Sequence, residues 1–228
     1  MADGQGNGTY YVDIVMCIDA TGSMNPILDE VKGNAMDFYQ KFVDGMEEAN
    51  KDVEQVRIKV IAFRDYKKDS EPVKESEFFM LPAQNEAFRD FVKGINADGG
   101  GDAPESALEA IALALKSDWT TEGDKQRHCI LVFTDAPAHP LGTGSDASTY
   151  PQGMPKDLAE LGSWWEGDQG LDSNYRPKAG RLVAFVPNAE PWTSLESWNR
   201  YWPAFSKAGT GLSEVDIQAA VDLLVGSC

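Results

Sequence analysis

The chain has 228 residues and a formal net charge of −17 at pH 7, and its pI is about 4.4. This acidity argues against nucleic acid or an anionic membrane surface as the main partner, and it favours cations and neutral or basic proteins. Apolar residues make up 42% of the chain, enough for the core of one α/β domain. Because no apolar run is long enough to span a bilayer, we expect no membrane insertion.

The first nine residues contain neither the basic cluster nor the apolar segment of a signal peptide. We therefore expect a flexible lead at 1–9 and a single domain over 10–228. The three cysteines, Cys17, Cys129 and Cys228, lack metal-binding spacing, which indicates buried or idle thiols in a reducing compartment. A cytoplasmic location is expected, and secretion is the alternative if a signal peptide has been trimmed from this sequence.

The stretch 10–19 is nearly continuously apolar and rich in β-branched residues, which predicts a strand buried on both faces. It ends abruptly in Asp19, Thr21 and Ser23. Apolar residues then recur at spacings of three or four, which predicts a helix at 26–46. The carboxyl end of a buried strand, where a helix begins, is where open α/β sheets bind ligands.

These three side chains offer one carboxylate and two hydroxyls. Such hard oxygen donors suit magnesium, manganese or calcium rather than zinc or copper. A structural alternative exists, because Thr21 or Ser23 could instead cap the free amides of the following helix.

The rest of the chain alternates predicted strands with predicted helices, an order typical of an α/β domain. The predicted elements are a strand at 56–63, an edge strand at 76–81, a helix at 86–95, an Ala-rich helix opening at Pro104, a strand from 128, a helix at 156–165, a strand at 181–186, a helix opened by a capping box at Thr193, a weak strand within 205–212 and a helix at 214–225.

Two further acids follow predicted strands. Asp135 ends the strand that begins at 128, and neighbouring strand ends in a doubly wound sheet would bring it close to Asp19. Asp65 follows the strand at 56–63, and the favoured interpretation is a loop carboxylate paired with Arg64 or Lys67.

Another acid, Asp102, lies in the Gly-rich segment before Pro104. Asp102 and Glu105 have the spacing of a capping box, with Asp in place of Ser or Thr. Capping and metal binding are compatible, because one carboxylate oxygen can accept an amide while the other binds an ion.

The segment Asp19-Ala-Thr21-Gly-Ser23 resembles the DxSxS or DxTxS signature of von Willebrand factor type A domains. Asp135, in Phe-Thr-Asp, is similar to the last metal-site aspartate of that family. The resemblance covers 10–225 and implies a Rossmann-like, doubly wound sheet, mostly parallel with one antiparallel edge strand and helices on both faces. It also implies a metal-ion-dependent adhesion site, with magnesium as the first choice of ion and manganese or calcium as alternatives.

The middle loop departs from the common family pattern. Its Gly-Gly-Gly-Asp102-Ala-Pro-Glu segment is similar to hemicentin-like and alpha-kinase-associated A domains. The resemblance makes Asp102 the fifth site residue and a third carboxylate near the ion. Tighter cation binding and weaker dependence on an acidic ligand would follow.

The resemblance implies a non-catalytic, cation-dependent module that binds another protein, whose acidic side chain completes the metal shell. The alternative is a magnesium-dependent phosphohydrolase, for which His139 is the one candidate base, although a loop histidine is more typically solvated. A regulatory domain acting on a partner ATPase would use the same site.

Overall fold

The computed structural model describes residues 8–99, 103–168, 170–209, 212 and 217–228, without the side chains of 30–37 and 217. Most of the predicted lead and Asp102 therefore lie outside the described residues.

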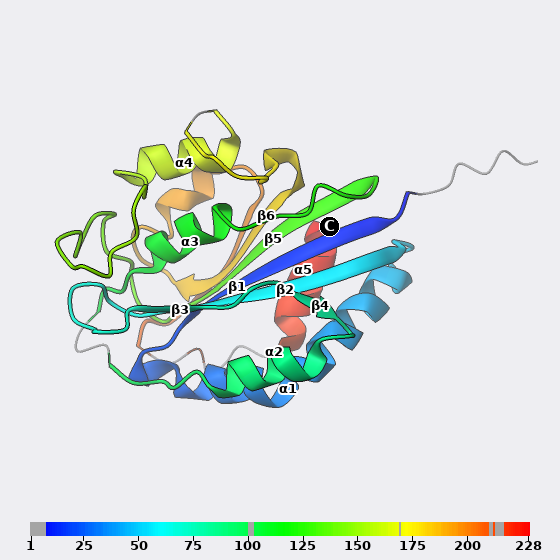
Figure 1. Ribbon diagram of the computed structural model, residues 1–228, viewed down its shortest axis with the longest axis horizontal. Helices are drawn as coiled ribbons and strands as arrows, with labels where there is room; N and C mark the ends of the chain where they lie inside the picture. The colour runs from blue at the N-terminus through cyan, green and yellow to red at the C-terminus, as the bar shows by residue number, and fades with distance from the viewer. Residues whose placement is uncertain (1–7, 100–102, 169, 210–211, 213–216) are drawn as a thin grey trace, which may run out of the picture.

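A single mixed sheet runs through the described part of the chain, in the order β3-β2-β1-β5-β6-β7, with β4 also paired to β2 (Figure 1). The long strands are parallel, and two short strands run antiparallel to β2 at one edge, which confirms the predicted fold class. The strands are β1 (Tyr10–Asp19), β2 (Val53–Phe63), β3 (Val73–Glu75), β4 (Phe79–Leu81), β5 (Lys125–Phe133), β6 (Gly180–Pro187) and β7 (Tyr201–Ser206).

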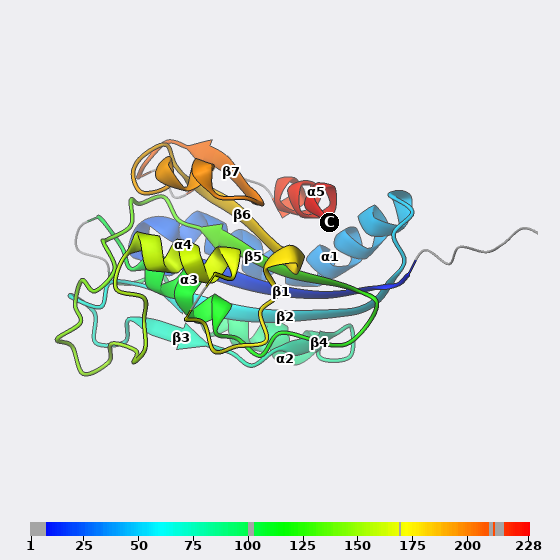
Figure 2. The same ribbon diagram turned by 90° about the horizontal axis from the view of Figure 1, so that it is seen from above.

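Helices cover both faces of the sheet (Figure 2). One face carries α1 (Asn25–Glu48), α2 (Asn85–Lys93) and α5 (Ile217–Ser227), and the other carries α3 (Ala107–Leu115) and α4 (Leu158–Glu166). Short 3-10 helices lie at Gly22–Met24, Pro177–Ala179 and Ser194–Ser197. Among the described helices, none has both the length and the apolar character to cross a membrane.

The continuous apolar run of β1 follows from its central place between β2 and β5. Ile14 and Met16 pack into the core beneath α1, whereas Val15 and Cys17 pack into the core beneath α3. With both faces covered, polar residues have no solvated side to occupy until the strand ends at Asp19.

The helix predicted to open at Pro104 instead begins at Ala107, so that prediction is wrong in its start. The main chain of Glu105 is used elsewhere: its N–H donates to the Pro137 oxygen, and its own oxygen accepts from the His139 N–H. This short bridge ties the segment before α3 to the loop after β5.

The helix predicted at Thr193 is also wrong, because only the 3-10 turn Ser194–Ser197 forms there. The hydroxyls of Thr193 and Ser194 both donate to the Glu190 carboxylate, so Thr193 does not cap the turn. Arg200 then adopts a positive φ of 60°, which ends a helical path.

The last strand lies earlier than the weak strand predicted within 205–212. In β7, Trp202 and Ala204 pack against one core and Tyr201 packs against the other. This period of two suits a strand between two apolar layers, and the segment pairs with β6 as a parallel strand.

Candidate metal centre

The loop after β1 holds a hydroxyl against a buried carboxylate. Asp19 is fully buried, and its Oδ1 accepts from the N–H and the Oγ1 of Thr21 at 2.9 and 2.6 Å. The buried Met24, whose N–H donates to the Thr21 oxygen at 3.0 Å, anchors the turn that follows. Ser23, between them, remains exposed.

Strand β5 delivers a second carboxylate to the same place. Because β1 and β5 are parallel neighbours, the loops leaving their carboxyl ends meet. Ser23 Oγ donates to Asp135 Oδ1 at 2.9 Å and lies 3.5 Å from Thr21 Oγ1. The structure thus brings together four of the five predicted site residues, Asp19, Thr21, Ser23 and Asp135.

Thr134 also belongs to this arrangement, although sequence reasoning assigned it no role. Its Oγ1 donates to Asp19 Oδ2 at 2.7 Å and accepts from the Ala136 N–H at 3.1 Å. The available signal was its place in Phe-Thr-Asp, a hydroxyl between the last apolar residue of the strand and Asp135. Its partner becomes identifiable only once β1 and β5 are known to be adjacent.

The electrostatics of the site favour a positive charge. Burial raises the pKa of Asp19 to about 6, hydrogen bonds from Thr21 and Thr134 oppose that rise, and the charge of Asp135 adds to it. Two carboxylates this close in a buried position are costly together unless a cation or a proton lies between them.

The donor set fits a small hard cation. In an octahedral magnesium site, neighbouring ligand oxygens lie about 3 Å apart. Here, consecutive oxygens from Asp19 to Asp135 are separated by 2.6, 3.5 and 2.9 Å. No group of three His, Cys, Asp or Glu side chains suited to a metal occurs among the described residues. The candidate therefore rests on carboxylates combined with hydroxyls.

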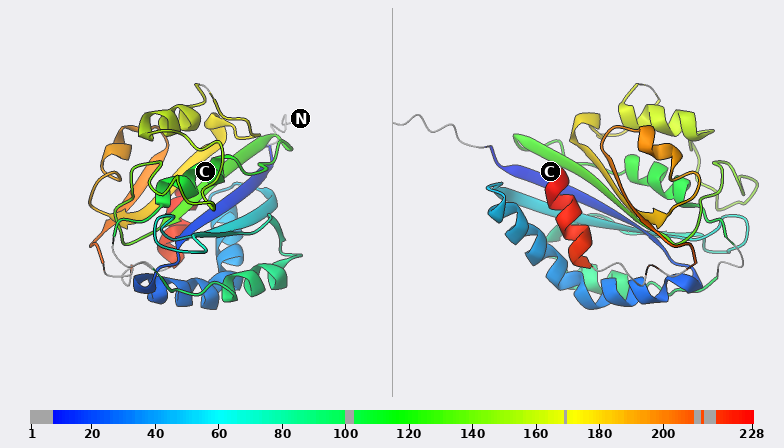
Figure 3. Two further views of the ribbon diagram at one scale, coloured as in Figure 1. Left: turned by 60° about the vertical axis from the view of Figure 1, so that its left-hand side comes forward. Right: turned by 180° about the vertical axis from the view of Figure 1, so that it is seen from behind.

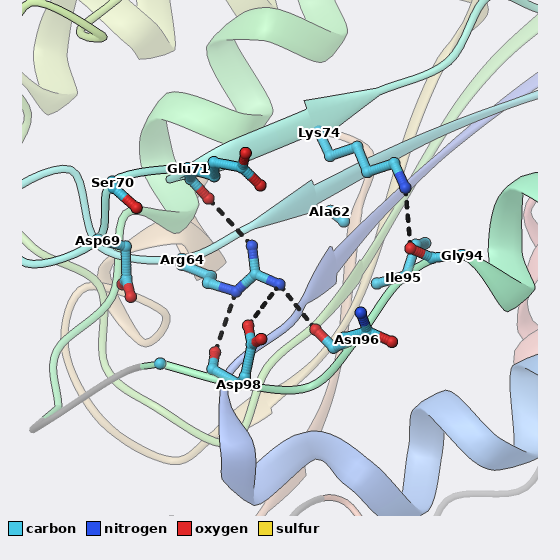
Figure 4. Close-up of a pocket in the computed structure, with 11 residues that line it drawn as sticks. Ala62, Arg64, Asp69, Ser70, Glu71, Lys74, Gly94, Ile95, Asn96 and Asp98 are labelled. Carbon is cyan, nitrogen blue, oxygen red and sulfur yellow. Dashed lines mark hydrogen bonds and ion pairs between the residues drawn. The ribbon is translucent and has the colours of Figure 1, made fainter.

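Arg64 fastens the neighbouring loops to the end of β1 (Figure 4). Its guanidinium donates to the main-chain oxygens of Ala20, Glu71, Asn96 and Asp98 at 2.7–3.1 Å and pairs with the Asp98 carboxylate at 3.0 Å. A polar hollow of about 390 Å³ lies beside these groups. Arg64 thus supports the loops that flank the site.

Asp102 follows this fastened segment. The Asp98 N–H donates to the Ala20 oxygen at 3.1 Å. A Cβ placed on Gly22 would lie 4.0 Å from the Gly99 oxygen. The chain leading to Asp102 therefore reaches the turn that carries Ser23, and the role of Asp102 itself stays a prediction.

Asp65 is buried and does not form the predicted pair with Arg64, which is occupied by the loops. One oxygen of Asp65 accepts from the Lys67 main-chain N–H at 2.8 Å, and the other lies 3.5 Å from His139 Nε2. The side chain of His139 is only 16% exposed, so the expectation of a solvated histidine is wrong.

The loop after Asp135 also lines an apolar pocket of about 400 Å³. The pocket lies between that loop, the starts of α3 and α4, and the loop after β6. Its apolar lining comes from Leu108, Ala138, Pro140, Leu141, Leu158 and Pro191.

Comparison with known families places these features in context. A family model described as von Willebrand factor A domain matches residues 13–143. Alpha-protein kinase vwkA of Dictyostelium discoideum is 25% identical over 153 residues, which cover 64% of this chain. The matched part spans only 22% of that kinase.

Solved structures resemble the fold. The pilus adhesin SpaC of Lactobacillus rhamnosus GG has a TM-score of 0.54 at 11% identity, covering 96% of this chain and 30% of SpaC. A von Willebrand factor type A protein of Catenulispora acidiphila has a TM-score of 0.51 at 14% identity, covering 93% and 42%. The vWF domain of the type V pili tip protein Mfa5 of Porphyromonas gingivalis has a TM-score of 0.51 at 15% identity, covering 96% and 95%.

Proposed function

Because this chain belongs to the von Willebrand factor A domain family, we propose that it is a non-catalytic module that binds another protein through a divalent cation. The observation that carries the proposal is the line of oxygens from Asp19 through Thr21 and Ser23 to Asp135. Magnesium is the proposed ion, with manganese or calcium as alternatives.

The four proposed ligands contribute different properties to the cation site. Asp19 and Asp135 supply negative charge, Thr21 and Ser23 supply neutral oxygens, and the exposed Ser23 leaves the site open to solvent. A bound cation would supply a positive charge for an acidic side chain of the partner. Because the chain as a whole carries −17, a neutral or basic partner that presents one carboxylate is favoured over an acidic one or a nucleic acid.

The apolar pocket lined by the loop after Asp135 supports a protein as the partner. A pocket of this size and lining accepts an apolar side chain. A peptide segment with an acidic residue and a nearby apolar residue could therefore occupy both places. The names of the structural relatives, a pilus adhesin and a pilus tip protein, support the same class of function.

Asp102 extends the proposal. As a third carboxylate, it would tighten cation binding and reduce the need for a carboxylate from the partner. We expect Asp102→Thr to bind magnesium more weakly than the wild type and to depend more strongly on an acidic partner. Equal metal affinity in the two proteins would count against this role.

The competing enzymatic function is less well supported. A phosphohydrolase needs a base within hydrogen-bond reach of the water at the metal. The side-chain contact of the candidate base His139 is with Asp65, at 3.5 Å, and Asp65 is not one of the proposed metal ligands. The kinase relative shares only a part of its length with this chain. We propose that the shared part is an A domain and carries no phosphotransfer activity, as in a regulatory module.

Calorimetric titration of metal-stripped protein with magnesium, manganese and calcium tests the proposal. We expect saturable binding that is lost in Asp19→Asn and Asp135→Asn. The matched control is Asp29→Asn, an exposed acid in α1, which should bind as the wild type does. Each variant is first checked for a native melting temperature, so that loss of binding is not loss of fold.

Partner binding is tested with an array of peptides that contain Glu or Asp. Capture that requires magnesium, is reversed by chelation and is lost in Ser23→Ala would support the proposal. A folded wild type that binds no divalent ion, or an Asp19→Asn variant that binds as well as the wild type, would overturn it. Magnesium-dependent hydrolysis of a phosphomonoester by the purified chain would favour the enzyme instead.

A further inference from the structure

The end of α5 lies against the face of the sheet that carries β5 and β6 (Figure 3). Basic side chains surround it there. Three basic side chains donate to the last main-chain oxygens of the helix and to that of Cys228, which follows it, where cations stabilise the helix dipole. The pairs are Lys51 Nζ with Val225 at 3.0 Å, Arg181 Nε with Ser227, and Arg127 Nε and Nη2 with Cys228 at 3.0 and 2.7 Å.

The contacts of Arg127 and Arg181 with the end of α5 involve the same part of the sheet as Cys129. Arg127 and Cys129 are two residues apart on β5 and therefore share a face. Cys129 is in register with Arg181 of β6, so all three side chains point toward the end of α5. Cys228 packs against the core cluster that contains Cys129. The two thiols are near enough to shift each other's pKa, upward for Cys129 and downward for Cys228.

The two thiols differ in a way that suits two roles. The nearby Cys129 thiol, followed by the charges of Arg127, Arg181 and Lys51, lowers the pKa of Cys228 against the opposing effect of burial. Burial raises the pKa of Cys129, which is fully buried. Cys228 is partly exposed, so it is the thiol that a reagent can reach.

We propose that Cys129 and Cys228 form a redox-active pair that closes into a disulfide and ties the end of α5 to β5. The oxidant is a small disulfide of the glutathione class. The Cys228 thiolate attacks it, forming a mixed disulfide and releasing one thiol. The Cys129 sulfur then attacks the Cys228 sulfur, the sulfur–sulfur bond to the oxidant breaks, and the Cys129 proton goes to the departing thiolate, which leaves as the second thiol. Two protein thiols are oxidised to one disulfide, and the oxidant is reduced to two thiols.

The Cys129–Cys228 disulfide would restrain α5, a helix that covers one face of the sheet. α5 packs against α1 and β6, and α1 begins directly after the loop that carries Ser23. A disulfide from 129 to 228 would hold α5 on the sheet and constrain the unfolded chain over a long loop. In a reducing compartment such a bond is transient, as in redox-sensing proteins.

The test uses the whole chain, equilibrated with oxidised and reduced glutathione, then alkylated, digested and analysed by mass spectrometry. We expect a cross-linked peptide that joins Cys129 to Cys228, in the wild type and equally in Cys17→Ser. The oxidised protein should melt about 5–10 °C above the reduced protein. This rise should vanish in Cys228→Ser. In Cys129→Ala, Cys228 should instead accumulate as the mixed disulfide with glutathione.

The proposal is overturned if folded, oxidised wild type contains no Cys129–Cys228 peptide. It is equally overturned if Cys228 of the wild type stops at the mixed disulfide, or if the cross-link joins Cys228 to Cys17 or to a second copy of the chain. Because the peptide is sought in the wild type, the test does not depend on the folding of any variant.

Discussion

Ser23 Oγ donates a hydrogen bond to Asp135 Oδ1 across 2.9 Å, although 112 residues separate the two in the chain. The contact exists because β1 and β5 lie side by side and run in the same direction. A site divided between two loops depends on the strands and on the residues behind it for its geometry. Substitutions at those supporting residues should therefore be measurable at the site.

Thr134 is the first such residue, because its hydroxyl holds Asp19 Oδ2 from behind. We expect Thr134→Val, which keeps the shape and removes the hydroxyl, to weaken magnesium binding by about tenfold or more. Thr134→Ser keeps the hydroxyl and is the matched control, with near-native affinity. Native affinity in a folded Thr134→Val, measured by calorimetry, would exclude this positioning role.

Arg64 should govern the order of the loops around the site. Lysine retains the charge but cannot reach the four main-chain oxygens that the guanidinium binds. We expect Arg64→Lys to lose about 2 kcal/mol of unfolding free energy and to speed hydrogen exchange at 96–98. Lys93→Gln, an exposed change on α2, is the control. Unchanged exchange at 96–98 in Arg64→Lys would contradict this role.

A buried ion pair lies at the opposite end of β1. Asp13 is fully buried and accepts from Arg57 at 2.8 and 2.6 Å and from the Thr120 N–H at 2.6 Å. Burial raises the pKa of Asp13, and the hydrogen bonds and charge of Arg57 only partly offset that rise. We expect Arg57→Met, which leaves the carboxylate without its cation, to cost about 3 kcal/mol or more in denaturant unfolding.

The double variant Asp13→Leu/Arg57→Met separates two effects: the loss of the ion pair itself, and the cost of leaving one buried charge without its partner. Removing both partners should cost clearly less than the sum of the two single changes, because no uncompensated charge remains in the core. Simple additivity of the three unfolding free energies would show that the two side chains act independently.

His128 should make stability fall as the pH is lowered. Its Nδ1 accepts from the Arg176 N–H, so Nε2 carries the proton and donates to the Thr120 oxygen. Burial, chiefly, lowers the pKa of His128 to about 4 from 6.5. Between these values the unfolded chain binds a proton that the folded chain does not. Stability is therefore lost as the pH falls from 6.5 toward 4, by up to about 3 kcal/mol.

Comparison with His128→Gln isolates that contribution. The raised pKa values of Asp13, Asp19 and Glu109 act in the opposite direction, but they are common to both proteins. The difference between the two unfolding curves should therefore shrink toward pH 4. A difference that does not change with pH would exclude His128 as a titrating group.

Sequence alone identified the strands that carry the site, because burial on both faces leaves a continuous apolar run that stops where the strand stops. That pattern located Asp19 and Asp135 at strand ends and indicated the oxygen chemistry of Thr21 and Ser23. Local patterns failed where a longer-range contact competed with them. At Thr193 the expected helix cap does not form, because the Thr193 hydroxyl donates to the Glu190 carboxylate and the following segment pairs with β6 as strand β7.

The tertiary structure decided which strand ends meet. Neither the 2.7 Å hydrogen bond of Thr134 to Asp19 nor the pairing of Asp65 with His139 follows from residue type or spacing. The same is true of the packing of Cys228 against the core cluster that contains Cys129. Side-chain periodicity records whether a residue faces a core, because burial depends on the local face of its element. The identity of its neighbour depends on strand order, which is set by the packing of the whole sheet.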